Sequence, residues 1–289
     1  MRLSRILKFI HQGSLRVHFS QYGEDVILHK LFGSKFSRGF YIDVGAHHPF
    51  RQSNTAYLWL LGWNGVNVDA NRRAIELFKR VRPDDVNLWS AVVDEATASQ
   101  HSEVTLHSNV DLDLGATCDP ELAKQRGTTR SEVVPCTSLS AIINQYGAQN
   151  GGVIDLLNID IEGFDEKAVQ SMAAWRFMPR VICIEIYEHN IRKVLDTAAC
   201  QAIESAGYTL LEVVGRVDDH QHPRAAVHDL LQPLGEQRHV EHHHQVRGAH
   251  RLERALAAAD GRHADLGPRR QRVDAKLVDV GAELVCGGE

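Results

Sequence analysis

The 289-residue chain lacks a long apolar run, and its few cysteines follow no motif. No stretch approaches the roughly 18 apolar residues that a membrane span requires, so we expect no membrane association. The five cysteines, an odd number without C-x-x-C spacing, predict neither a disulfide framework nor a zinc site and fit a cytoplasmic location. A net charge of -5 gives no electrostatic reason to expect a nucleic-acid partner. No feature indicates an oligomeric state.

Both ends of the chain lack the residues that build a core. Residues 1–19 have no continuous apolar segment or cleavage site of a signal peptide, and we interpret them as an N-terminal extension. No aromatic residue follows Tyr208, whereas nine of the seventeen histidines lie in residues 217–289. We therefore expect one domain over residues 20–216, followed by a His/Arg-rich tail that is disordered or translated out of frame. A metal-binding tail is a less favoured alternative, because the histidines are irregularly spaced.

Strand-like and helix-like runs alternate through residues 20–216, which predicts an α/β domain with a mostly parallel, doubly wound sheet. The pattern predicts strands at 40–44, 65–69, 86–93, 153–161, 181–187 and 208–214. It predicts helices at 54–61, 72–81, 165–175 and 191–206. The pattern weakens between residues 94 and 134, where 103–107 could be a strand and 111–129 a polar loop that covers a site.

Polar residues stand at the ends of four predicted strands, although a strand buried on both faces should be apolar. In an open α/β sheet this edge is the ligand crevice, so these residues are candidates for a functional site. The set is Asp43, Asp69, Asp160, Glu162, Glu185 and His189.

Gly45 and Asp69 predict a nucleoside site. Gly45 fits a tight turn that approaches a ligand, and Asp69 stands where one carboxylate can accept both ribose hydroxyls. Alternatively, Asp69 caps the following helix and Gly45 serves an ordinary turn. NAD enzymes need a G-x-G-x-x-G turn for the pyrophosphate, but this turn reads Gly-Ala-His-His-Pro. A cofactor without phosphate, such as S-adenosylmethionine, fits better, with Asp43 near its cationic methionine part.

Asp160, Glu185 and His189 are the candidate catalytic residues. Period-two geometry puts Asp160 and Glu162 on one face of their strand, and Glu185 and His189 on one face of the next. Such a cluster could bind an acceptor, remove the proton of its hydroxyl, or hold a divalent cation. The cation is the least favoured of these, so we predict no metal.

Five motifs occur in order along the domain: SQYGED (20–25), GFYIDVGAHHP (39–49), SNT (53–55), GWNG (62–65) and IDIEG (159–163). Together they resemble the FkbM family of methyltransferases over about residues 19–214. The resemblance implies a Rossmann-like class I methyltransferase sheet with helices on both faces and S-adenosylmethionine as cofactor. It also implies O-methylation of a hydroxyl on a sugar, polyketide or similar small molecule.

The resemblance assigns roles to individual residues. Cofactor contact falls on Asp43, Gly45, Ala46 and Asp69, and substrate contact on Ser53, Asn54, Thr55 and Glu162. The sequence departs from the family pattern in two places. Asn158 stands where many family members have a lysine, and the chain after Val214 does not resemble the final strand of the family's sheet. We therefore expect that strand to be missing or altered, which would expose a sheet edge. A non-catalytic remnant with this fold and, less favoured, an NAD-dependent oxidoreductase are the alternatives.

Overall fold

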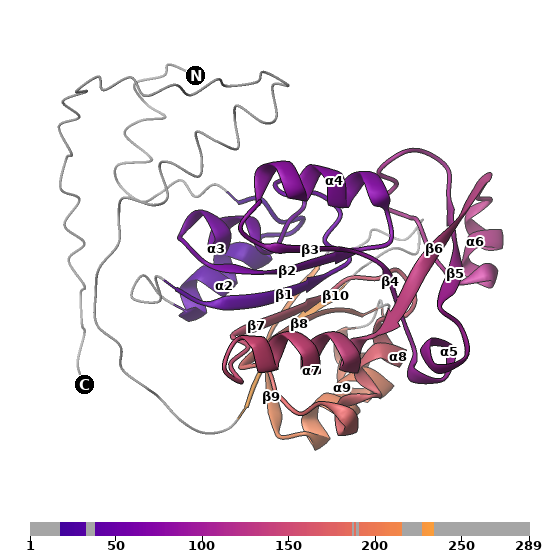
Figure 1. Cartoon of the computed structure of the whole chain (residues 1–289). Coiled ribbons are helices and arrows are strands. Elements are labelled where there is room, and N and C mark those ends of the chain that lie inside the picture. Colours follow the sequence, from indigo (N-terminus) through magenta and orange to yellow (C-terminus); the bar gives the residue numbers. More distant parts are fainter. Residues whose placement is uncertain (1–17, 33–37, 187, 189–190, 216–226, 234–289) are drawn as a thin grey trace, which may run out of the picture.

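Seven strands form one sheet between two layers of helices (Figure 1). The computed structural model describes residues 18–32, 38–186, 188, 191–215 and 227–233. The strand order is β3-β2-β1-β7-β8-β10-β9, and the first five strands are parallel. The bounds are β1 Phe40–Val44, β2 Asn64–Asp69, β3 Val86–Trp89, β7 Leu156–Ile159, β8 Val181–Ile186, β9 Tyr208–Gly215 and β10 Val227–Pro233. The chain order reverses between β1 and β7, and ligands of such sheets bind at this switch point.

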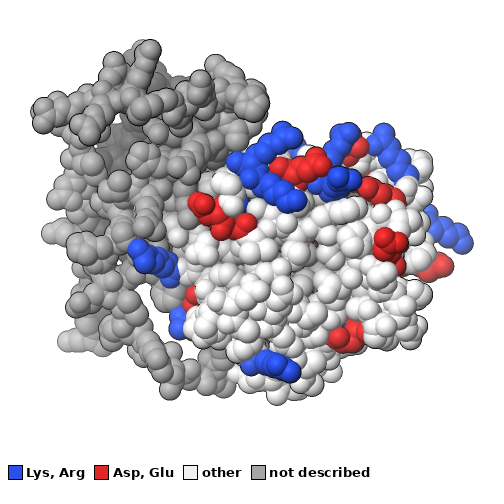
Figure 2. All heavy atoms as spheres, viewed as in Figure 1, with Lys and Arg blue, Asp and Glu red and all other residues white. Residues whose placement is uncertain are grey.

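The central strands are buried because helices cover both faces of the sheet. All five residues of β1 and all six of β8 are buried, as expected for parallel strands. One face carries α2 (Glu24–Phe32), α3 (Ala56–Leu60) and α4 (Arg72–Val81); the other carries α7 (Leu139–Gln149), α8 (Asp165–Val169) and α9 (Ala198–Ser205) (Figure 1). Charged residues of both signs gather over α4 (Figure 2). Arg72 and Glu76 of this helix form an ion pair. Among the described helices, none combines the length and apolarity needed to cross a bilayer.

A second sheet, with strand order β4-β6-β5, contains three strands. It consists of β4 (Ala91–Val93), β5 (Glu103–Ser108) and β6 (Arg130–Ser138), with α5 (Glu95–Gln100) and α6 (Pro120–Arg126) in its connections. The strand predicted at 86–93 is thus two strands, β3 and β4, and the strand at 103–107 is confirmed as β5. The predicted loop 111–129 contains α6, which Asp119 caps at its start and Gly127 ends with a left-handed conformation.

Other element boundaries also differ from the sequence pattern. Strand β6 and helix α7 lie where the pattern indicated no regular element. The helix predicted at 165–175 is α8 followed by the short 3-10 helix η1 (Met172–Ala174). The helix predicted at 191–206 begins as the 3-10 helix η2 (Ile191–Asp196), and α9 starts after Thr197, whose side chain accepts the Cys200 N–H.

The last strand of the sheet is present, so of the two expectations, a missing or an altered strand, the first does not hold. Strand β10 lies between β8 and β9 and pairs antiparallel with both. The pattern missed β10 because its sequence, VHDLLQP, has no aromatic residue or isoleucine. The sheet therefore extends past residue 216, the predicted end of the domain. Residues 1–17, and most of the predicted tail, lie outside the described residues.

We predict that the domain needs β10 for stability. A chain ending at Gly215 would expose the edges of β8 and β9, whereas a chain ending at Gly235 would keep both ladders. Each lost backbone hydrogen bond contributes roughly 0.5–1.5 kcal/mol, so the shorter chain should lose at least ~3 kcal/mol of unfolding free energy. Denaturant unfolding of both truncated chains measures this difference; equal midpoints would show that β10 contributes nothing.

Candidate active site at the carboxyl ends of the parallel strands

Gly45 brings the end of β1 into direct contact with the end of β7. Its φ is +80°, and a Cβ atom there would lie 1.6 Å from the carbonyl oxygen of Asp160. The Asp160 N–H in turn donates to the Val44 carbonyl at 2.9 Å. Glycine is therefore required both for the backbone conformation and for the close approach. The motifs at 39–49 and 159–163 meet at this contact.

The backbone N–H groups of the turn after β1 already have hydrogen-bond acceptors within the protein. Those of Gly45 and Ala46 donate to the Val68 carbonyl, and that of His48 donates to the Ala46 carbonyl. The His47 N–H donates to Asp69 at 2.7 Å. The His48 Nδ1 atom accepts the N–H groups of residues 50 and 51, and burial lowers the pKa of this imidazole to about 4, so the ring is neutral. Residue 49 is proline, so this turn presents no N–H cradle to a phosphate.

Asp69 is held by its neighbours and faces a cavity. One carboxylate oxygen accepts the His47 N–H and the other accepts the Asn71 N–H at 2.6 Å. Asn71, rather than Asp69, caps α4, because its side chain accepts the N–H groups of residues 73 and 74. A carboxylate has about four lone-pair sites, so each oxygen of Asp69 can accept a further donor. Burial raises the pKa of Asp69 to about 6.

A cavity of about 480 Å³ crosses the carboxyl ends of four neighbouring strands. Asp69 of β2 and Gly45 after β1 line one part of it. Asp160 and Glu162 after β7 and Glu185 of β8 line the other part. Strands of a sheet lie about 4.8 Å apart, so β2 and β8, three strands apart, are separated by about 14 Å.

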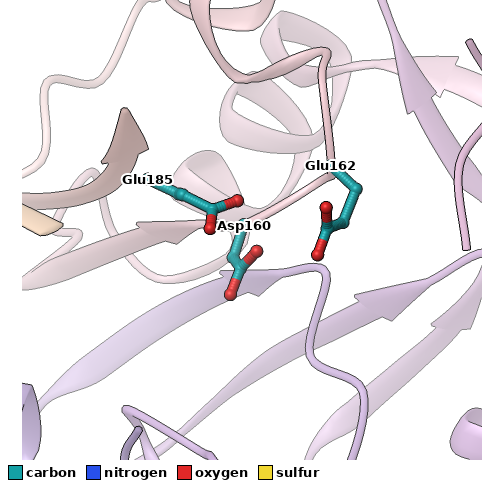
Figure 3. A group of neighbouring side chains, drawn as sticks. All are labelled: Asp160, Glu162 and Glu185. Atoms are coloured by element: carbon teal, nitrogen blue, oxygen red, sulfur yellow. The ribbon is translucent and has the colours of Figure 1, made fainter. Parts of the chain in front are cut away.

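The part of the cavity at the ends of β7 and β8 contains three converging carboxylates (Figure 3). Asp160, Glu162 and Glu185 each offer one oxygen, and these oxygens lie within 4.8 Å of one another. Burial raises the pKa of Asp160 well above its usual range, and the nearby Glu185, which is hydrogen-bonded to it, raises it further. The Asp160–Glu185 pair can therefore hold a proton between them. The same three oxygens could hold a divalent cation.

Glu162 connects this part of the cavity to a separate segment of the chain. Its carboxylate accepts a hydrogen bond from Arg126 Nη2 of α6 at 2.6 Å, and its carbonyl accepts one from the Thr117 hydroxyl. Arg126 Nη1 also donates to the Gly115 carbonyl. Residues 109 and 113–118 and Arg126 line the cavity, so this segment forms one of its walls. The prediction that the region near 111–129 covers a site thus agrees with the geometry.

A polar network is buried behind the cavity. Asp43 is 2% exposed, and its carboxylate accepts hydrogen bonds from the Thr55 hydroxyl at 2.5 Å and from Asn158 Nδ2 at 2.9 Å. The side-chain oxygen of Asn158, Oδ1, accepts a hydrogen bond from Asn54 Nδ2 at 2.9 Å. Burial raises the pKa of Asp43, and these hydrogen bonds oppose the shift.

Arg82 is the cation of this network. It is fully buried, and its two terminal nitrogens donate to Tyr41, Thr55, Asn67, Ser53 and the Pro49 carbonyl. Its charge lowers the pKa of Asp43 and of Asp85, against the larger effect of burial. Arg82 thereby fastens the loop 49–55 to β1 and β2.

Comparison with protein families identifies the domain. The family described as methyltransferase FkbM domain matches residues 43–210, which is more than half of the chain. The chain belongs to the FkbM methyltransferase family. No curated protein and no solved structure gave a significant match. The FkbM match and the parallel sheet confirm the Rossmann-like fold and the family predicted from the motifs.

The FkbM domain brings together some of the predicted site residues and separates others. Gly45, Asp69, Asp160, Glu162 and Glu185 all line the cavity. His189 lies outside the described residues. Ala46 is buried and does not line this cavity.

The side chains predicted beside the cavity at Asp43, Ser53, Asn54 and Thr55 are buried in the Arg82 network instead. Their polar atoms bond to one another and to Arg82, and direct contact of these residues with cofactor or substrate stays a prediction. In the FkbM domain these residues support the turn that shapes the cavity.

Sequence reasoning missed Arg82, Arg126 and the role of Asn158. Arg82 directly precedes Pro83 at the end of α4, where a basic residue usually points to solvent, so no local signal marked its burial. Arg126 lies in a segment without a clear pattern. Asn158 carried a weak signal, because a polar side chain in the middle of a buried strand calls for partners.

We predict that Arg82→Met destabilises the FkbM domain strongly. The substitution leaves the buried carboxylates of Asp43 and Asp85 without a counter-charge, which should cost ~3–5 kcal/mol of unfolding free energy. Arg80→Met on the exposed side of the same helix is the matched control and should change it by about 0.5 kcal/mol or less. Denaturant unfolding measures both variants. An Arg82 variant as stable as the control would show that the network is not needed for folding.

Proposed function

We propose that this protein is an S-adenosylmethionine-dependent O-methyltransferase that acts on a hydroxyl of a sugar, polyketide or similar small molecule. The observation that carries the proposal is the turn after β1. Its backbone N–H groups already donate hydrogen bonds within the protein, and the carboxylate beside it, Asp69, faces the cavity. A dinucleotide needs free N–H groups for its pyrophosphate, whereas S-adenosylmethionine has no phosphate. The volume of about 480 Å³ is in the range of small-molecule sites.

We call the part of the cavity lined by Asp69 and Gly45 the cofactor half, and the part lined by Asp160, Glu162 and Glu185 the acceptor half. In the cofactor half, Asp69 would accept hydrogen bonds from the ribose hydroxyls, and its bonds to the backbone would keep its oxygens aligned. Gly45 would let the ligand approach the backbone of the turn. When bound, the cofactor supplies a methyl group on a positively charged sulfur. The carboxylates of the neighbouring acceptor half would favour that positive charge.

In the acceptor half, the Asp160–Glu185 pair would accept the proton of the reacting hydroxyl as its oxygen forms the new bond to carbon. A pair that shares one proton still carries one negative charge, so it can act as a general base. Methyl transfer to oxygen is an in-line displacement, so alignment of donor and acceptor supplies much of the catalysis. His189 stays a candidate for the general base. The cytoplasmic location of the protein also stays a prediction.

We predict that Asp69→Asn weakens binding of S-adenosylmethionine roughly 10–100-fold, because hydrogen bonds to a charged group contribute about 1.5–3 kcal/mol. Calorimetric titration measures the affinity. In the wild type the affinity should also fall as the pH decreases through about 6, where Asp69 becomes protonated. The Asn variant has no proton to gain at this position, so its affinity should depend less on pH. Unchanged affinity in the variant would refute the ribose assignment.

We predict that Asp160→Asn lowers kcat by about 10²–10⁴-fold, the usual range for a general base. The affinity for S-adenosylmethionine should change by less than about threefold, since Asp160 acts on the acceptor side. Release of S-adenosylhomocysteine with a panel of hydroxylated acceptors measures turnover. Glu166→Gln, an exposed acid on α8, is the control. Wild-type turnover by the Asp160 variant would remove this residue from the mechanism.

A further inference from the structure

The turn before α2 contributes two side chains to the cavity. Gln21 and Tyr22 line it together with Glu185, although they precede the first strand of the sheet. The Gln21 side-chain amide donates to the Tyr22 hydroxyl at 3.1 Å, so the two polar groups lie next to each other. The sequence motif at 20–25 is thus part of the cavity wall.

Hydrogen bonds fix the backbone of this turn. Asp25 accepts the Phe19 N–H at 2.6 Å and the Ser20 hydroxyl at 2.7 Å. The Ser20 oxygen accepts the Gly23 N–H at 3.1 Å, and Glu24 accepts the Tyr22 N–H at 2.9 Å. Ser20, Glu24 and Asp25 are all buried. The acidic residues of the motif therefore hold the turn, and residues 21 and 22 are the ones presented to the cavity.

The turn is also fastened to the body of the domain. The Ser53 N–H donates to the Phe19 carbonyl at 3.2 Å, and the Phe19 ring contacts Phe50 with 5.9 Å between centroids. Both partners belong to the loop 49–55 that Arg82 holds. Gln21 and Tyr22 thus start from a backbone that is positioned before any ligand arrives.

Strand geometry places the turn on the acceptor side. Val181 and Cys183 of β8 pack in the same core cluster as Leu28 of α2. Side chains two residues apart point to one face of a strand, so Glu185 also faces the layer that contains α2. Strand β8 is three strands from β2, which carries Asp69, so a nucleoside held by Asp69 leaves the β8 end free.

We propose that Gln21 and Tyr22 are specificity-determining residues that contact the acceptor, and that this acceptor carries several hydroxyl groups on a ring. The inference rests on the proposed function. A tyrosine ring packs on the C–H face of a sugar-like ring, while its hydroxyl and the glutamine amide bond the ring hydroxyls. The carboxylates of Asp160 and Glu185 accept hydrogen bonds from the same kind of group.

The test uses the full-length protein with the variants Gln21→Ala, Tyr22→Phe and Tyr22→Ala. A panel of neutral methyl pyranosides and cyclitols serves as acceptors, and S-adenosylhomocysteine release gives kcat and KM. We expect each alanine variant to raise the acceptor KM at least tenfold. Tyr22→Phe keeps the ring and should show a smaller rise. Tyr57→Ala on α3, away from the cavity, is the control and should leave KM unchanged.

Calorimetry with S-adenosylmethionine separates this inference from the proposed function. We expect all three variants to bind the cofactor within twofold of the wild type and to keep its thermal midpoint. A tenfold loss of cofactor affinity in the Tyr22 variants, or an unchanged acceptor KM, would overturn the inference while leaving methyl transfer intact. A wild type that does not bind S-adenosylmethionine would overturn the proposed function. A wild type that binds it but turns over no member of the panel would overturn the ring-hydroxyl acceptor.

Discussion

The burial of Arg82 is the constraint on which the rest of the site depends. A buried guanidinium costs several kcal/mol of lost hydration, so its neighbours must supply acceptors and negative charge. Here the acceptors come from β1, β2 and the loop 49–55, and the negative charge comes from Asp43 and Asp85. The same loop anchors the turn at 19–23 through Ser53. One buried cation thus sets the positions of two walls of the cavity.

The two halves of the cavity are coupled at Gly45. Its contact with the Asp160 carbonyl leaves no room for a side chain, so the turn after β1 and the backbone of Asp160 are packed directly against each other. Such coupling suits a reaction in which donor and acceptor must be aligned. The carboxylates themselves are unfavourable for stability at neutral pH, because burial raises the pKa of Asp69, Asp160 and Asp165. A functional site explains why the fold retains them.

Much of the fold could be predicted, because the five parallel strands and the helices α3, α4 and α9 have strong local patterns. Several of the elements that were missed lack such patterns. Helix α6 lies in a polar stretch, and β10 is a weak strand whose position depends on the hydrogen bonds of β8 and β9 rather than on its own residues. The strand predicted at 86–93 divides at Ser90, where its chain leaves the main sheet for the second one.

The sequence by itself determined which backbone positions meet at the site, because parallel strands bring their carboxyl ends to one edge. Gly45, Asp69 and Asp160 follow from that rule. Only the tertiary structure decided which side chains face the cavity. Asp43 turns into the buried network because Arg82 arrives there from the end of α4, and Tyr22 reaches the cavity because α2 shares a core cluster with β8. Contacts between residues far apart in the sequence set these orientations, so the local sequence pattern does not predict them.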